Sequence, residues 1–260
     1  MSVVHLDRRA LLLLWLFMLG IPLSAQGDTR VRSTASAVTV PAGQLQLSLF
    51  QLSRYGLTDR VEIATQPLLL PLLPQAELKI NWLRRKHFSL GSRLRAAYPP
   101  LLLNALSGEG ALALLPKDAP IPFSLLLAAE GLATAHLHPA HEITLNVTLT
   151  VAPRESYIDT PQLDFPFLYS RFAALWSSGT YLVGLTYEGR LLETLVLCAG
   201  LRTFLLPATP GGFSLEPWAN VRFLVGEHVG LELGLIVEYA RFPAGVQHHL
   251  LPFLDATVAF

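Results

Sequence analysis

His87 and Ser89 have the residue types and the spacing of a nucleophilic pair. They lie two positions apart, so on an extended strand their side chains would point to the same face. A histidine beside a serine can act as a base while the serine hydroxyl attacks an ester carbonyl. The sequence identifies no acid to orient the histidine, and Arg84-Arg85-Lys86 before the pair indicate a turn. We expect no enzymatic activity and no catalytic residue, with a hydrolase at His87 and Ser89 as the weak alternative.

Three histidines form a second candidate cluster. His136, His138 and His141 are arranged around Pro139, and imidazoles at this spacing can bind zinc. No aspartate or cysteine completes the set, which favours a polar turn between two strands. The sequence also lacks a phosphate-binding glycine loop, a nucleophile elbow and an HExxH motif. We expect no metal and no cofactor.

A third set of chemically capable residues consists of charges at every second position of apolar segments. Both signs are present, so these side chains could line a polar pore or could pair with one another and fill a closed interior. Both possibilities stay open. The charged residues expected to line the interior are Glu62, Glu77, Lys79, Arg93, Arg95, Glu142, Arg222, Glu232 and Glu238.

The segments that must position these charges alternate with period two. In residues 142–152 and 229–241, every second side chain is apolar and most of those between are polar, over about ten residues. This length suits a tilted strand that crosses a bilayer, and apolar-out, polar-in alternation is typical of a transmembrane barrel. A soluble all-β periplasmic fold is the rival, because two packed sheets would bury the same faces.

The N-terminus has the pattern of a secretory signal peptide. Arg8 and Arg9 precede an apolar run from Ala10 to Leu23, and small residues follow up to Ala25. We expect cleavage after Ala25. Residues 26–42 would then form an N-terminal periplasmic segment or a first strand, and residues 43–260 the barrel.

The composition agrees with a membrane protein. Of the 260 residues, 52% are hydrophobic and 15% charged, with 19 basic and 19 acidic residues. This balance excludes a strongly basic nucleic-acid-binding protein, and the apolar content excludes a disordered chain. A helical span needs about 20 consecutive apolar residues, and the sequence after the leader supplies no such run.

The C-terminus resembles the assembly signal of Gram-negative outer-membrane barrels. Leu254, Ala256, Val258 and Phe260 share one face of the last predicted strand, and the chain stops on the aromatic residue. The hairpin at residues 55–63 is likewise similar to one in transporter-like and porin-like barrels. The resemblance implies an outer-membrane location, with membrane lipids and the barrel-assembly machinery as partners.

A narrower resemblance concerns the possible chemistry. His87 and Ser89 look like the His-x-Ser pair of outer-membrane phospholipases and lipid A deacylases. Leu90 stands where those enzymes usually have an asparagine.

Thirteen segments read as strands, whereas a bacterial barrel needs an even number. The long loops predicted at 153–166 and 207–212 also cannot both face outward, because the three predicted strands between them would place the two loops at opposite ends of the barrel. We therefore predict an all-β, antiparallel transmembrane barrel of about 12 strands, with 10 to 14 possible. The segments are 43–54, 59–67, 75–85, 88–98, 108–115, 121–137, 142–152, 167–176, 180–188, 190–206, 213–225, 229–241 and 249–260.

The leading functional hypothesis is a passive or facilitated channel for small solutes, whose identity the sequence leaves open. A closed structural or adhesion barrel with binding loops is the alternative. A lipid-modifying hydrolase that uses Ser89 is the third.

Overall fold

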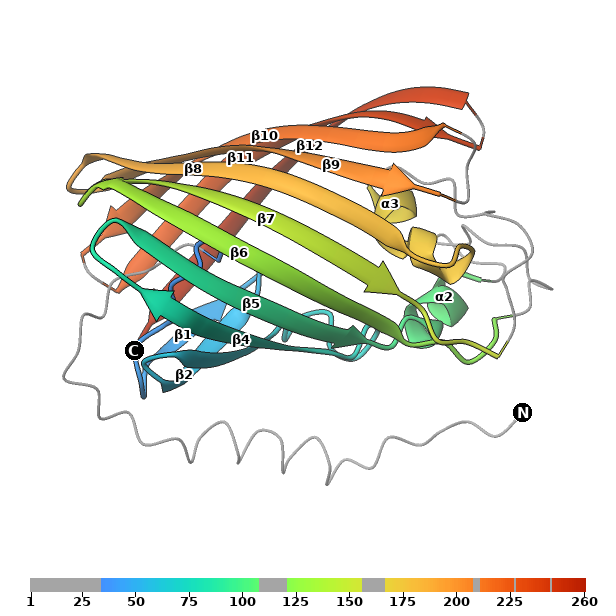
Figure 1. Cartoon of the computed structure of the whole chain (residues 1–260), viewed down its shortest axis with the longest axis horizontal. Helices are drawn as coiled ribbons and strands as arrows, with labels where there is room; N and C mark the ends of the chain where they lie inside the picture. Colours follow the sequence, from blue (N-terminus) through green and yellow to red (C-terminus); the bar gives the residue numbers. More distant parts are fainter. Residues whose placement is uncertain (1–33, 108–120, 156–166, 208–210, 227, 244) are drawn as a thin grey trace.

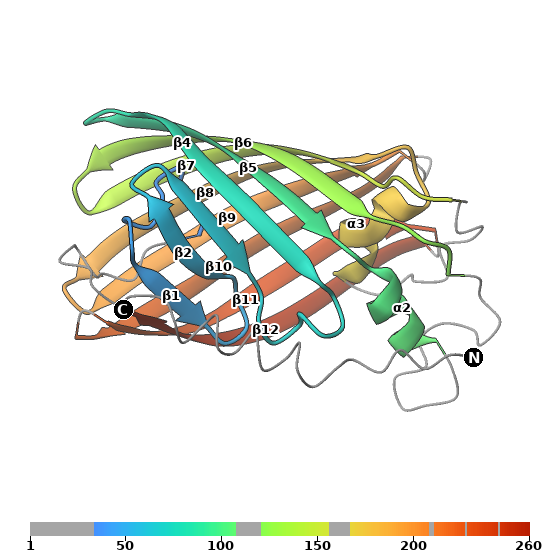
Figure 2. The same cartoon turned by 90° about the horizontal axis from the view of Figure 1, so that it is seen from below.

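A computed structural model describes residues 34–107, 121–155, 167–207, 211–226, 228–243 and 245–260. The expected signal peptide therefore lies outside the described residues. Within them, twelve antiparallel strands close into a barrel in which each strand pairs with its neighbours in the chain. Figure 2 shows β1 between β2 and β12, where the barrel closes. The closed antiparallel barrel of twelve strands confirms the predicted fold.

The strands lengthen along the chain. Their bounds are β1 Leu45–Ser48, β2 Ser53–Thr58, β3 Val61–Thr65, β4 Gln75–Arg84, β5 Phe88–Ala97, β6 Leu126–His138, β7 His141–Val151, β8 Thr180–Leu192, β9 Leu195–Leu206, β10 Gly212–Val225, β11 Val229–Phe242 and β12 Gly245–Ala259.

The alternating pattern sorts side chains between the two faces of the wall. Leu233 of β11 lies opposite Leu254 of β12, and these side chains are 62% and 60% exposed on the outer surface. Their neighbours Glu232 and Asp255 also lie opposite each other, but they point inward and are buried. The barrel therefore has an apolar outer face and a polar interior, as a membrane-spanning barrel requires.

The number of strands agrees with the prediction although some of the segments do not. Residues 43–54 contain β1 and the connection to β2, and residues 108–115 lie outside the described part. Residues 167–176 were wrongly predicted as a strand, because they form α3 (Leu168–Phe172) and the 3-10 helix η1 (Ala173–Leu175). Two strands rather than three therefore separate the loops at 153–166 and 207–212, which places both loops at the same end.

The two ends of the barrel differ (Figure 1). At the short-turn end, on the left, tight connections join β2–β3, β4–β5, β6–β7, β8–β9 and β10–β11. At the long-loop end, on the right, the β5–β6 connection carries α2 (Pro100–Leu106) and the β7–β8 connection carries α3 and η1. Residue 189, which separates the predicted segments 180–188 and 190–206, lies within β8, and the turn falls at residues 193–194. None of the helices in the described residues is long and apolar enough to cross a membrane.

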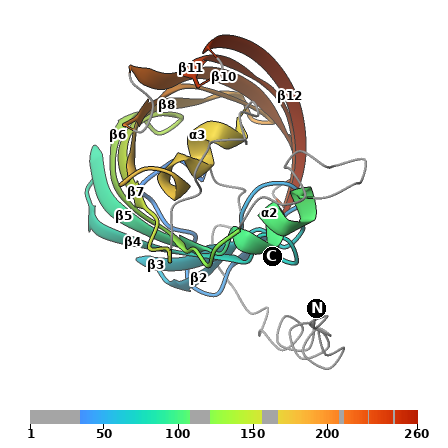
Figure 3. The same ribbon diagram turned by 90° about the vertical axis from the view of Figure 1, so that its right-hand side faces the viewer.

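The helix α3 lies inside the barrel (Figure 3). Tyr169 is completely buried, with its ring centroid 4.7 Å from that of Phe242 and 5.0 Å from that of Trp176. Leu206 and Phe204 of β9 complete this apolar cluster. The cluster narrows the interior at the long-loop end.

Candidate functional site

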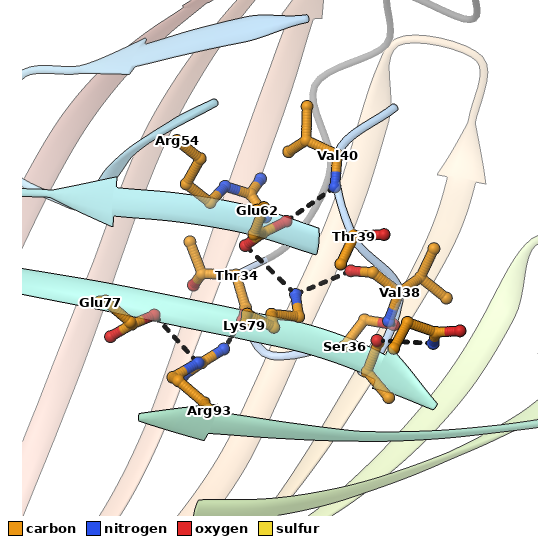
Figure 4. Close-up of polar contacts among 12 residues, drawn as sticks. Thr34, Ser36, Val38, Thr39, Val40, Arg54, Glu62, Glu77, Lys79 and Arg93 are labelled. Carbon is orange, nitrogen blue, oxygen red and sulfur yellow. Dashed lines mark hydrogen bonds and ion pairs between the residues drawn. The ribbon is translucent and has the colours of Figure 1, made fainter. Parts of the chain in front are cut away.

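The N-terminal segment, residues 34–44, lies inside the barrel against its wall (Figure 4). Side chains of two strands bind its backbone carbonyls. Lys79 Nζ donates to the carbonyl of Val38 at 2.7 Å, and Asn81 Nδ2 donates to that of Ala37 at 2.9 Å. Arg93 donates to the carbonyl of Thr34.

Glu62 of β3 is the acidic centre of this arrangement. Its carboxylate accepts a hydrogen bond from the backbone N–H of Val40 at 2.7 Å, and it lies 3.5 Å from Lys79 and 3.8 Å from Arg54. All three charged side chains are buried. The three charges belong to β2, β3 and β4, and the N-terminal segment meets them through two backbone groups, the N–H of Val40 and the carbonyl of Val38.

A turn redirects the N-terminal segment from the interior into β1. Gly43 has a φ of +77°, a conformation that side chains rarely adopt, and the N–H of Gln44 donates to the carbonyl of Pro41 at 3.1 Å. Gly56 of β2 lies directly beneath this turn. A Cβ at Gly56 would come within 2.0 Å of the Pro41 carbonyl oxygen, so the absence of a side chain there allows the close approach.

A second ion-pair cluster lies deeper in the barrel, on β4, β5 and β6. Glu77 pairs with Arg93 at 3.0 Å and with Arg95 at 2.8 Å. Arg93 also pairs with Glu130 at 3.1 Å, and Glu130 accepts a hydrogen bond from Asn146.

A third set of charges lies on the opposite wall. Arg222 pairs with Glu232 at 3.1 Å, and Glu232 also accepts hydrogen bonds from Asn220 and Gln51. At the long-loop end, Arg171 of α3 makes two hydrogen bonds of 2.8 Å to Glu216.

Most of the charges selected from the sequence take part in these clusters. Glu238 accepts hydrogen bonds from the N–H of Phe167 and from Ser214, and so anchors the start of α3. Glu142 lies apart from the clusters at the short-turn end, where it faces His136. Sequence reasoning missed several interior charges, of which Glu130 follows a poorly alternating run. The missed residues include Arg54, Glu130, Arg171, Glu188, Arg202 and Asp255.

Ser89 contacts a different histidine from the predicted one. Its hydroxyl lies 2.9 Å from Nε2 of His136, whose Nδ1 lies 3.4 Å from the carboxylate of Glu142. Ser89 pairs across the strands with Thr134, and His136 follows two positions later on the same face, whereas His87 lies in the turn. The alternative that paired His87 with Ser89 is therefore corrected, because the histidine that contacts Ser89 is His136. The Ser89 side chain is completely buried.

The histidine cluster brackets the β6–β7 turn. The rings of His138 and His141 are 5.8 Å apart. In the part of the chain that the structure describes, no three potential metal ligands of the His, Cys, Asp or Glu type are grouped to hold an ion.

The last strand completes the barrel wall. Leu254 and Phe260 are exposed on the outside, while Ala256 and Val258 are partly covered. The backbones of Phe260 and Leu45 form two hydrogen bonds: the N–H of Phe260 donates to the carbonyl of Leu45 at 2.8 Å, and the N–H of Leu45 donates to the carbonyl of Phe260 at 3.2 Å. Of the residues expected as an assembly signal, Val258 and Phe260 therefore belong to the seam with β1, and Ala256 accepts a hydrogen bond from the N–H of Leu49 just after it.

Among the described residues, several cavities follow the barrel interior. One of about 610 Å³ opens at the short-turn end and is lined by the basic β4–β5 turn, the histidine turn and Ser36. One of about 310 Å³ lies against β9–β12, and one of about 490 Å³ extends towards α3. Thr34 lines both of these inner cavities. The N-terminal segment thus lies between the cavity at the short-turn end and the two inner ones.

Comparison with known proteins gives neighbours in structure alone. No family model and no curated protein matches the sequence. The fold is similar to the KdgM porin in complex with disordered oligogalacturonate, with 6% identity, a TM-score of 0.46 and coverage of 84% of this chain and 96% of that one. It is also similar to the outer membrane channel DcaP of Acinetobacter baumannii, with 8% identity, a TM-score of 0.42 and coverage of 90% and 68%. An outer membrane channel from Pseudomonas putida F1 shows 10% identity, a TM-score of 0.42 and coverage of 91% and 100%.

Proposed function

We propose that the protein is a Gram-negative outer-membrane channel for small solutes, and that its N-terminal segment controls the passage. The outer face supports the location, since large apolar side chains such as Leu231, Leu233 and Leu235 point away from the interior along one strand. In bacterial barrels short turns face the periplasm and long loops face outward. We therefore place the short-turn end, the N-terminal segment and Phe260 on the periplasmic side.

The observation that carries the proposal is the position of the N-terminal segment between the cavity at the short-turn end and the two inner cavities. Thr34 contributes to the walls of the two inner cavities and Ser36 to that of the cavity at the short-turn end. Within residues 34–40, the bonds to the wall come from side chains such as Lys79 and Asn81 rather than from strand pairing. A segment held in this way can leave without breaking the barrel ladder.

A disulfide lock tests this function directly. A Cβ at Gly91 would lie 3.5 Å from the Cβ of Ala37, and disulfides join Cβ atoms about 3.5–4.5 Å apart. We expect the variant Ala37→Cys/Gly91→Cys, made with Cys198→Ser to remove the native thiol, to conduct several-fold less in planar bilayers when oxidised than when reduced. Because that Cβ would also come within 2.9 Å of the Ile80 carbonyl, Gly91→Ala is the control for crowding.

The outcomes separate the two functional classes. If the oxidised and reduced forms conduct equally, the N-terminal segment does not control the passage. If the wild type and the reduced variant pass neither ions nor small solutes, the protein is a closed structural or adhesion barrel and the channel proposal fails.

A hydrolase is the second candidate function, favoured by the chain of contacts from Ser89 through His136 to Glu142. In such a chain the histidine takes the serine proton and the carboxylate orients the imidazole. Ala37 of the N-terminal segment donates to Thr134, the cross-strand neighbour of Ser89, so substrate would reach Ser89 after the segment leaves. Labelling by a fluorophosphonate, present in the reduced disulfide variant and absent when Ser89→Ala is added, would support it. No labelling in the reduced variant would exclude it.

A further inference from the structure

The cavity of about 310 Å³ has a size found among small-molecule sites, which start at roughly 300 Å³. Its lining includes Arg202, Trp218, Asn220 and Arg222 of β9 and β10, and Phe253 of β12. Thr34 and Ala35 of the N-terminal segment, together with Gln51, Leu52 and Gln66, form further parts of the wall. This inner cavity is also lined by Glu232, the ion-pair partner of Arg222.

Three buried polar atoms in this wall lack hydrogen-bond partners among the described residues. They are Nε1 of Trp218, Oδ1 of Asn220 and Nη1 of Arg222, of which the last lies 3.9 Å from the carboxylate of Glu188. Asn220 and Arg222 are each only 6% exposed. A buried polar group without a partner is costly, so the unbonded atoms of Trp218 and Asn220 indicate a place for a polar ligand.

Arg202 supplies a positive charge to the same cavity. It lies opposite Glu216 in the β9–β10 pairing, but both carboxylate oxygens of Glu216 are bound by Arg171 of α3. Within the described chain, no carboxylate lies within ion-pairing distance of Arg202. Its guanidinium lies 5.2 Å from the centre of the Trp218 ring and borders both inner cavities.

Two glycines let aromatic rings approach the backbone of the wall beside this charge. A Cβ at Gly200 would lie 2.6 Å from Trp218 Nε1, and one at Gly234 would lie 2.4 Å from the Phe253 ring. The two rings occupy the room that side chains at these positions would take. An apolar surface therefore lies beside the guanidinium groups, which suits a solute with a carbon body.

We infer that this cavity is a binding station for a small hydroxylated organic anion on its way through the channel. The carboxylate would be bound by Arg202, with the N–H groups of Trp218 and Arg222 as further donors. Asn220 Oδ1, an acceptor, would receive a hydrogen bond from a hydroxyl of the solute. The inference rests on the proposed function and names the class of solute.

Calorimetric titration of the full-length protein refolded in detergent tests this inference, with D-gluconate as the probe and D-glucitol as its uncharged counterpart. Hydrogen bonds to charged groups are worth about twice the neutral ones, so we expect gluconate to bind at least about ten-fold more tightly than glucitol. Arg202→Gln should remove that preference. Trp218→Phe, which keeps a ring but removes the N–H, should weaken gluconate binding several-fold.

Arg190→Gln is the matched control, because Arg190 borders the cavity at the short-turn end and has no ion-pair partner among the described residues. It should bind gluconate as the wild type does, and heat-modifiable gel migration shows that each variant is folded. Equal binding of gluconate and glucitol, no binding of either, or an equal loss in Arg190→Gln would overturn the inference. Binding in detergent needs no open passage, so a failure here is distinct from a lack of conductance in bilayers.

Discussion

Lys79 donates a hydrogen bond from its completely buried ammonium to the carbonyl of Val38, 2.7 Å away. The same ammonium lies 3.5 Å from the carboxylate of Glu62, which accepts the N–H of Val40. The Lys79 ammonium therefore contacts the backbone of the N-terminal segment directly, and also indirectly through the carboxylate of Glu62.

Removing this cation should release the N-terminal segment. In Lys79→Met the carbonyl of Val38 loses its donor, and Glu62 retains Arg54 as its charged neighbour. We expect a several-fold rise in mean conductance in planar bilayers, with more frequent transitions between open and closed levels. Arg60→Met, in the exposed β2–β3 turn, should leave the conductance near the wild-type value. If folded Lys79→Met shows the same conductance and the same transitions between open and closed levels as the wild type, Lys79 stabilises the structure without controlling the passage.

The bidentate contact between Arg171 and Glu216 should hold α3 in the interior. Glu216→Gln keeps the size of the side chain but removes the charge that both Arg171 donors use. Charge-assisted hydrogen bonds are stronger than neutral ones, so Glu216→Gln should hold α3 less tightly in the interior. We therefore expect higher and noisier single-channel currents. Glu193→Gln, in the exposed β8–β9 turn, is the control. Currents identical to those of the wild type would mean that the apolar cluster around Tyr169 holds α3 without the ion pair.

The wall of the barrel could be predicted from sequence because its pattern is local. Leu233 and Glu232 are neighbours in the chain, and their opposite exposure follows from the period of a strand. The strand prediction for residues 167–176 was wrong because this segment is largely apolar without alternation, and a short apolar run alone does not distinguish strand from helix. The apolar cluster that holds it inside involves Phe242, more than sixty positions later.

The interior could not be predicted in the same way, because its contacts join distant parts of the chain. Val38 and Lys79 are 41 positions apart, and Ser89 and His136 are 47 apart. The sequence placed His87 beside Ser89 because it is near in the chain. Pairing of β5 with β6 brings His136 there instead, since Ser89 lies opposite Thr134. Strand register, which a single sequence leaves open, decides such contacts.

An arginine on the outer wall should destabilise the barrel according to its depth in the bilayer. Leu233→Arg places a charge within β11, and Leu191→Arg places one next to the β8–β9 turn, at residues that are 62% and 53% exposed. Arginine costs roughly 2–4 kcal/mol at the bilayer midplane and roughly 0–1 kcal/mol near the interface. We therefore expect Leu233→Arg to lower the free energy of unfolding by about 2 kcal/mol more than Leu191→Arg, as measured by urea denaturation in lipid vesicles. Equal costs at the two sites would contradict a lipid-facing outer surface.

The terminal aromatic residue should affect assembly in the cell more than the stability of the finished barrel. Phe260 is joined to Leu45 through backbone atoms, and its ring is 43% exposed, so Phe260→Ser keeps both seam hydrogen bonds and removes an outward side chain. We expect the folded fraction in outer-membrane preparations to fall several-fold, measured by heat-modifiable migration. Refolding of the purified variant into detergent should reach the wild-type yield. Leu250→Ser, an outward residue of the same strand that is 64% exposed, lies outside the expected signal and should assemble normally. If Phe260→Ser and Leu250→Ser assemble equally well, the C-terminal residues are part of the barrel wall without being a signal to the assembly machinery.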